Sequence, residues 1–93
     1  MILIATTYNG LNGIFNYNNC TCVKIQNDTI ILLENKEVHY LAIIKNKEIR
    51  EKVYKIIRDR IIDFNAKNEN GCINVDVIVK QVENKTDDRI YWN

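Results

Sequence analysis

Apolar and polar residues alternate along the first half of the chain, a pattern typical of β-strands. Residues 2–8 and 14–17 are apolar and rich in β-branched or aromatic side chains, and residues 20–26 alternate between two faces. The pairs at positions 9–10 and 12–13 are Asn-Gly, which is a strong turn signal. The pattern therefore predicts a series of short strands joined by tight turns.

The next stretch predicts a β-hairpin. Thr29–Glu34 and residues 37–44 flank the pair Asn35-Lys36, which suits a two-residue hairpin loop. Both faces of the return strand, residues 37–44, are largely apolar. We therefore expect this strand to be central in the sheet, or covered by the helix on one side and by a partner on the other.

Residues 46–65 change to the period of an α-helix. Asn46 is a favourable N-cap, and Glu48 stands in the first turn, where the helix dipole favours an acid. At about 100° per residue, six apolar side chains share an arc of roughly 140°. They are Ile49, Val53, Ile56, Ile57, Ile61 and Phe64. This stripe predicts an amphipathic helix packed on the sheet, with Ile62 on the opposite, charged side.

After Gly71 the chain alternates again, and residues 72–83 predict a last strand with Ile73, Val75, Val77 and Val79 facing inward. A polar turn follows, and residues 89–93 form an aromatic tail. We therefore expect one α+β domain with a β-meander at 1–45, a helix at 46–65 and a final strand. Its antiparallel sheet of about five to six strands carries one amphipathic helix on one face.

Composition and charge exclude some functions. The chain has 93 residues, of which 46% are hydrophobic and 27% charged, as in ordinary globular proteins. The net charge is +1, which argues against a strongly basic nucleic-acid protein and against an acidic nucleic-acid mimic. Residues 45–63 hold seven basic and four acidic residues, a sum of +3 that leaves −2 for the remainder. A chain this short gains stability from self-association, so a homodimer is an open expectation.

The N-terminal residues and the cysteines indicate a compartment. The first residues carry no charged segment and only a short apolar run, so we expect neither a signal peptide nor a membrane span. Three cysteines without a secretion signal suggest free thiols in a reducing cytoplasm.

Few residues suggest chemistry. Cys20 and Cys22 share a strand face, and Cys72 and His39 could in principle complete a metal site or a thiol–imidazole pair. The alternative is three thiols that pack as small hydrophobic groups and one cross-strand histidine. No serine motif, glycine-rich phosphate loop or H-E-x-x-H is present. We expect no enzyme, no metal and no cofactor.

The helix surface and the C-terminus are the candidate partner-binding regions. Lys52, Lys55 and Arg58 could contact phosphates or an acidic protein patch, or form a solvated face stabilised by Glu–Lys pairs. Tyr54 and Ile62 beside them are typical of protein interfaces. The pair Tyr91-Trp92 either caps the core, docks on a second subunit, or stays free for a partner. The predicted partner-binding residues are Lys52, Tyr54, Lys55, Arg58, Ile62, Tyr91 and Trp92.

The chain resembles very small proteins of low-GC Gram-positive bacteria and their phages. The resemblance is carried by VHYLAIIKNKEIREKVYKIIRDRI and by the N-terminal MILIATTYNG, and it covers roughly residues 1–65. The chain departs from that pattern after Gly71. The resemblance implies an accessory protein of a phage or mobile element, a group that includes inhibitors of host defence such as anti-CRISPR proteins.

Three functional hypotheses follow. The first is a non-enzymatic protein-interaction module that inhibits or modulates a bacterial defence complex in the host cytoplasm. The second is a nucleic-acid-binding accessory protein that uses the basic helix face. The third is a thiol or metal enzyme built on the cysteines and His39.

Overall fold

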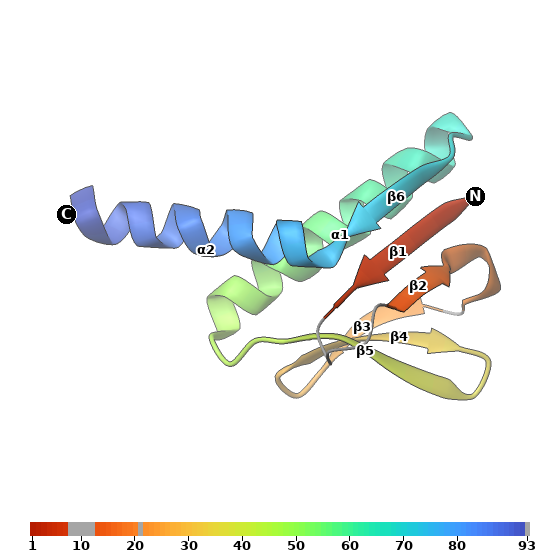
Figure 1. Ribbon diagram of the computed structural model, residues 1–93, viewed down its shortest axis with the longest axis horizontal. Coiled ribbons are helices and arrows are strands. Elements are labelled where there is room, and N and C mark those ends of the chain that lie inside the picture. Colours follow the sequence, from red (N-terminus) through yellow and green to blue (C-terminus); the bar gives the residue numbers. More distant parts are fainter. Residues whose placement is uncertain (8–12, 21, 93) are drawn as a thin grey trace.

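The computed structural model describes residues 1–7, 13–20 and 22–92, with side chains up to residue 85. Within these residues the fold is α+β, as predicted (Figure 1). The strands are β1 (Ile2–Thr6), β2 (Gly13–Asn16), β3 (Cys22–Gln26), β4 (Thr29–Glu34), β5 (Glu37–Ile43) and β6 (Gly71–Asn74). The helices are α1 (Lys47–Lys67) and α2 (Val75–Trp92), with a short 3-10 turn, η1 (Tyr17–Asn19). The predicted Asn-Gly turns lie wholly or partly outside the described residues.

The strands form two three-stranded sheets rather than the single antiparallel meander that the sequence predicted. One sheet has the order β2-β1-β6, and β6 runs parallel to β1. The other is the antiparallel sheet β3-β4-β5. Consequently β4 is the central strand of its sheet, and β5, expected to be central, lies at the edge.

Asparagine sets both tight turns of the antiparallel sheet. Asn27 and Asn35 adopt φ of 57° and 55°, a left-handed conformation that asparagine tolerates better than most residues. The pairing of Glu34 with Glu37 leaves the predicted two-residue loop between them. A register shift between Ile30 and Ile31 gives β5 one extra residue, Leu41.

Helix α1 confirms most of the predicted helix and extends it by two residues. The side chain of Asn46 accepts a hydrogen bond from the Ile49 N–H at 3.0 Å, so it is the N-cap. Asn68 ends the helix in the left-handed conformation with φ of 53°. The six stripe residues are buried or packed against the core, and Glu48 pairs with Lys52 at 2.9 Å.

The prediction of a long last strand at residues 72–83 is wrong. Only residues 71–74 are strand, and the following residues form α2. Asn74 caps this helix, because its Oδ1 accepts a hydrogen bond from the Val77 N–H at 3.2 Å. Val77, expected to face inward, is 46% exposed. Val75, Ile78 and Val82 are buried at helical spacing.

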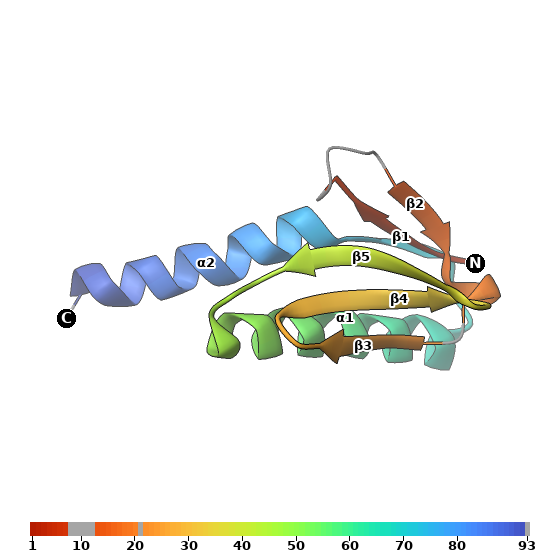
Figure 2. The ribbon, with the colours of Figure 1, turned by 90° about the horizontal axis from the view of Figure 1, so that it is seen from below.

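The predictions of a polar turn and of a separate aromatic tail are also wrong, because the described residues of both segments belong to α2. The backbone of residues 84–92 continues α2, and Figures 1 and 2 show this helix extending away from the two sheets.

One core joins both sheets and both helices. Its buried members come from every layer: Ile2, Ile4, Ile30, Leu32, Leu41, Ala42, Ile44, Val53, Ile57, Ile61, Ile73, Val75, Ile78 and Val82. Side-chain hydrogen bonds at the end of β1 tie it to its neighbours. The buried hydroxyl of Thr6 donates to the Leu41 carbonyl at 2.7 Å, and the Thr7 hydroxyl donates to Asp76 Oδ2 at 2.6 Å. The two sheets are therefore parts of one packed unit.

Candidate functional site

The predicted basic face of α1 is exposed but partly neutralised by its own helix. Lys55 and Arg58 are exposed, and Ile62 is 57% exposed among them. Lys52 pairs with Glu48 at 2.9 Å, and Arg58 lies 3.7 Å from Asp59. Exposed pairs of this kind contribute little to stability, but they reduce the positive field available to a phosphate or an acidic partner.

Tyr54 does not lie free on this face. It packs against the core, and its hydroxyl donates to the Val23 carbonyl at 3.4 Å. The ring therefore helps to hold α1 on β3.

The other predicted residues lie in the last turn of α2. The backbone of Tyr91 and Trp92 is helical, at the end that Figure 1 shows far from both sheets. Their side chains lie outside the described residues, so their predicted role stays a prediction.

The cysteines do not form the group that a thiol-based metal site would need. Among the described residues, no cysteine belongs to a cluster of three or more potential metal ligands. The half-buried Cys20 thiol donates to the Asn16 carbonyl at 3.3 Å, and Cys72 is exposed on β6. Burial, and then the negative charge of Glu34, raise the pKa of the Cys20 thiol, which lowers its thiolate fraction at neutral pH.

The predicted partner-binding residues include none from the side of the β3-β4-β5 sheet opposite α1, which we call the outer face. Figure 2 looks onto this side, with α1 behind the strands. Three cross-strand rows make up the outer face: Cys22, Leu33 and Val38; Lys24, Ile31 and Tyr40; and Gln26, Thr29 and Ile43. None of these nine residues belongs to the main core or packs against it. Their neighbours Ile30, Leu32 and Ala42 belong to the core, and Val23 and Ile25 pack against it.

The outer face is apolar where a solvated face would be polar. Val38, Tyr40 and Ile43 on the edge strand β5 are 48%, 51% and 37% exposed. Ile31, at the centre of the face, is only 1% exposed although it lies outside the main core. Antiparallel sheets with one solvated face normally alternate apolar inside and polar outside. Here the outer side of β4 and β5 is largely apolar instead, and the polar side chains Glu34, Glu37 and His39 lie on the inner side near the hairpin tip.

Charge is nearly absent from the outer face. Lys24 is the only charged residue among the nine, and it is exposed. No ion pair of Lys24 is present within the described residues. The outer face therefore has exposed apolar side chains on β5 and one positively charged side chain, Lys24, on β3.

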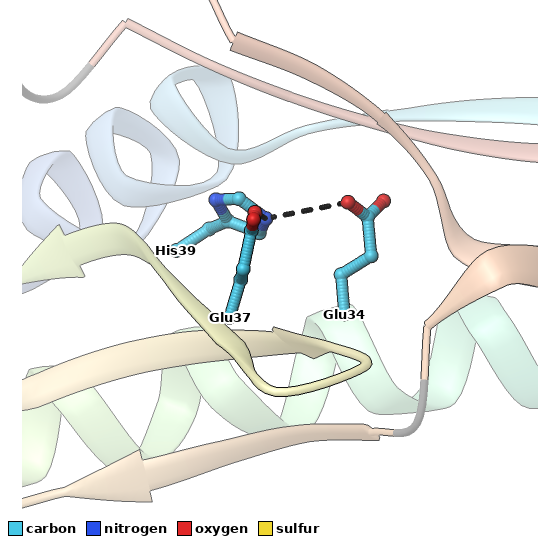
Figure 3. A group of neighbouring side chains, drawn as sticks. All are labelled: Glu34, Glu37 and His39. Carbon is cyan, nitrogen blue, oxygen red and sulfur yellow. Dashed lines mark ion pairs between the residues drawn. The ribbon is translucent and has the colours of Figure 1, made fainter.

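A second group lies on the inner side of the same hairpin. Glu34, Glu37 and His39 converge between the hairpin tip and β2, as Figure 3 shows. His39 Nε2 lies 3.6 Å from Glu34 Oε1 and 3.8 Å from Glu37 Oε2. The imidazole stacks on Phe15 of β2, with ring centroids 4.4 Å apart. These three residues could hold a cation.

A shallow depression of about 510 Å³ lies where the ends of β1 and β5 meet the two helices. Lys45, Lys80, Asp76 and Glu83 lie along it. The Asp76 carboxylate already accepts hydrogen bonds from the Thr7 N–H and hydroxyl. The depression therefore mixes charges of both signs without a group poised for chemistry.

Comparisons with known proteins give no relative: no family model matches the chain, and no curated protein or solved structure is significantly similar to it. Among the described residues, no helix is both long and apolar enough to cross a membrane.

The outer face did leave a signal in the sequence. Residues 37–44 are largely apolar on both faces, which predicts either a central strand or a strand covered by the helix on one side and by a partner on the other. The first alternative is wrong, because β5 lies at the edge of its sheet with exposed apolar side chains on its outer side.

Proposed function

We propose that the protein is a non-enzymatic interaction module that docks on another protein through the outer face. The observation that carries the proposal is the exposure of Val38, Tyr40 and Ile43 on β5, the strand whose Leu41 and Ala42 are already buried in the core. Covering these side chains removes apolar area from water, which is the main driving force of protein association.

The charge of the outer face favours a protein over a nucleic acid. A nucleic-acid surface tracks phosphates with several lysines and arginines, and this face has only Lys24. The basic side of α1 remains the alternative surface for nucleic acid, although Lys52 and Arg58 lie beside Glu48 and Asp59.

Charge complementarity also favours a different protein over a second copy. The outer face contains no carboxylate, so the same face of a second copy has no acid to pair with Lys24. We therefore propose a partner with an apolar patch and an acidic side chain at its margin. Because this chain resembles phage accessory proteins, a bacterial defence complex is the partner to test first.

The Cys20 thiol fits this proposal. Cys20 has a raised pKa and donates its hydrogen to a backbone carbonyl, so it is a poor nucleophile at neutral pH. A non-enzymatic role requires no reactive thiol.

The experiment compares two double variants with the wild-type chain. Val38→Lys/Tyr40→Lys places charge on the outer face, and Lys55→Glu/Arg58→Glu reverses charge on α1. Each tagged protein is incubated with lysate of a low-GC Gram-positive host, and captured proteins are identified by mass spectrometry. Binding of the captured partner, purified, is then measured by calorimetry. We expect Val38→Lys/Tyr40→Lys to weaken binding at least about tenfold and the α1 variant to leave it within about threefold.

The outcomes separate the possible occupants. Loss of binding only in the α1 variant would move the interface to the predicted helix face. Light scattering that shows a dimer of the wild type, dissociated by Val38→Lys/Tyr40→Lys, would identify a second copy as the occupant. Equal binding by all three proteins would overturn the proposal.

A further inference from the structure

We infer that Glu34, Glu37 and His39 form a binding site for a divalent transition-metal cation of the zinc type. All three residues belong to the β4-β5 hairpin. Glu34 and Glu37 are direct cross-strand partners beside the tight turn, and His39 follows Glu37 by two residues. Alternation along a strand puts all three side chains on the inner side of the sheet, as drawn in Figure 3.

The spacing of the donor atoms suits a shared ion. One nitrogen and two carboxylate oxygens lie within 4.8 Å of one another, and the two distances to His39 Nε2 are 3.6 and 3.8 Å. Two ligands of a tetrahedral zinc ion, each about 2.0–2.2 Å from the metal, are about 3.4 Å apart. Small rotations of the two glutamate side chains close the difference without moving a strand.

The imidazole nitrogen supplies an observation independent of the acidic residues. His39 Nε2 is buried and has no hydrogen-bond partner within the described part of the chain. The carboxylates at 3.6 and 3.8 Å are too far away for hydrogen bonds. A buried polar atom without a partner is costly, and a coordinated cation would remove that cost. Stacking on Phe15 fixes the ring with Nε2 toward the carboxylates.

The donor set selects the class of cation. Imidazole suits zinc and its first-row neighbours, whereas magnesium and calcium prefer oxygen ligands only. Glu37 is 75% exposed and Glu34 is 31% exposed, so solvent and ions reach the site from the glutamate side. Three protein ligands leave at least one coordination position for water or a ligand atom of a partner.

The test uses the fact that His39 is the only histidine of the chain. Its imidazole C–H signals are identified directly in the proton NMR spectrum. We expect zinc chloride to shift these signals until one equivalent is bound, and magnesium chloride to leave them unchanged. In Glu34→Gln/Glu37→Gln the apparent Kd should rise at least about tenfold. Glu69→Gln/Glu83→Gln, which removes the same charge from exposed positions elsewhere, should bind zinc like the wild type.

The thiols require a control of their own, because cysteine also binds zinc. Zinc should shift the His39 signals of Cys20→Ser/Cys22→Ser as it does those of the wild type. If this cysteine variant does not fold, the comparison of the wild type with Glu34→Gln/Glu37→Gln decides whether the glutamates bind zinc. Histidine signals that zinc does not shift, or equal zinc affinity in Glu34→Gln/Glu37→Gln, would overturn the site. Loss of zinc binding in Cys20→Ser/Cys22→Ser would also overturn the site. The outer face lies on the other side of the sheet, so failure here leaves the proposed function standing.

Discussion

Tyr17 and Cys20 show how burial changes individual residues of this protein. Burial raises the pKa of the Tyr17 hydroxyl, and the nearby thiols of Cys22 and Cys20 and the Tyr54 hydroxyl raise it further. Burial also raises the pKa of the Cys20 thiol, with the charge of Glu34 as the second cause. Both groups lie where η1 joins β3, so this corner of the molecule favours the protonated form of each.

The direction of these shifts predicts alkaline destabilisation. Above their ordinary pKa values of 9.0 and 10.0, the unfolded chain releases protons that the folded chain retains. The folded state then binds more protons, so the free energy of unfolding falls as pH rises through this range. Urea unfolding between pH 7 and pH 11 measures the effect. We expect Tyr17→Phe to flatten the decrease above pH 10.0; a slope equal to that of the wild type would contradict this account.

Residues whose roles are local were predictable, and those that depend on distant contacts were not. Asn46 and Asn35 act within three residues of their own position, as an N-cap and in a tight turn, and both predictions are confirmed. The hairpin register alone would have placed Glu34, Glu37 and His39 together. The stacking of His39 on Phe15 could not be predicted, because it depends on how the two sheets pack.

At the scale of elements, the segment after Gly71 shows why a short apolar run is ambiguous. Residues 73–79 alternate well enough to predict a strand, but the positions at 75, 78, 79 and 82 also fit a helical stripe. The buried residues Val75, Ile78 and Val82 follow the helical spacing, and the strand changes to a helix directly after Asn74. The strand prediction failed because it followed the alternation alone and did not identify Asn74 as a helix cap.

The cap of α2 yields a direct test. Asn74→Ala removes the acceptor of the Val77 N–H, and we expect the free energy of unfolding to fall by about 1 kcal/mol. Asn74→Asp keeps an acceptor and should restore most of the loss. Chemical denaturation with circular dichroism measures both variants, and Asn46→Ala at the cap of α1 is the matched comparison. Wild-type stability in Asn74→Ala would show that α2 does not depend on this cap.

At the scale of the whole molecule, the division into two sheets could not be predicted from local pattern. The parallel pairing of β1 with β6 joins residues about seventy positions apart, for example Ile4 with Ile73. No turn chemistry marks such a contact, because a helix-containing crossover separates the two strands. The fold class was predictable from the balance of strand and helix patterns. The number of sheets depended on long-range packing, and so did the edge position of β5 and the open outer face.

The two sides of the β3-β4-β5 sheet should therefore respond differently to substitution. Leu32 is fully buried on the inner side, so we expect Leu32→Ala to cost about 2–5 kcal/mol of the free energy of unfolding. Val38 and Tyr40 are about half exposed on the outer side. We therefore expect Val38→Lys/Tyr40→Lys to change the free energy of unfolding by no more than about 1 kcal/mol. Urea unfolding of the isolated chain measures both. A large loss in the lysine variant would mean that the outer face supports the fold itself, and its exposed apolar side chains would then need no partner to explain them.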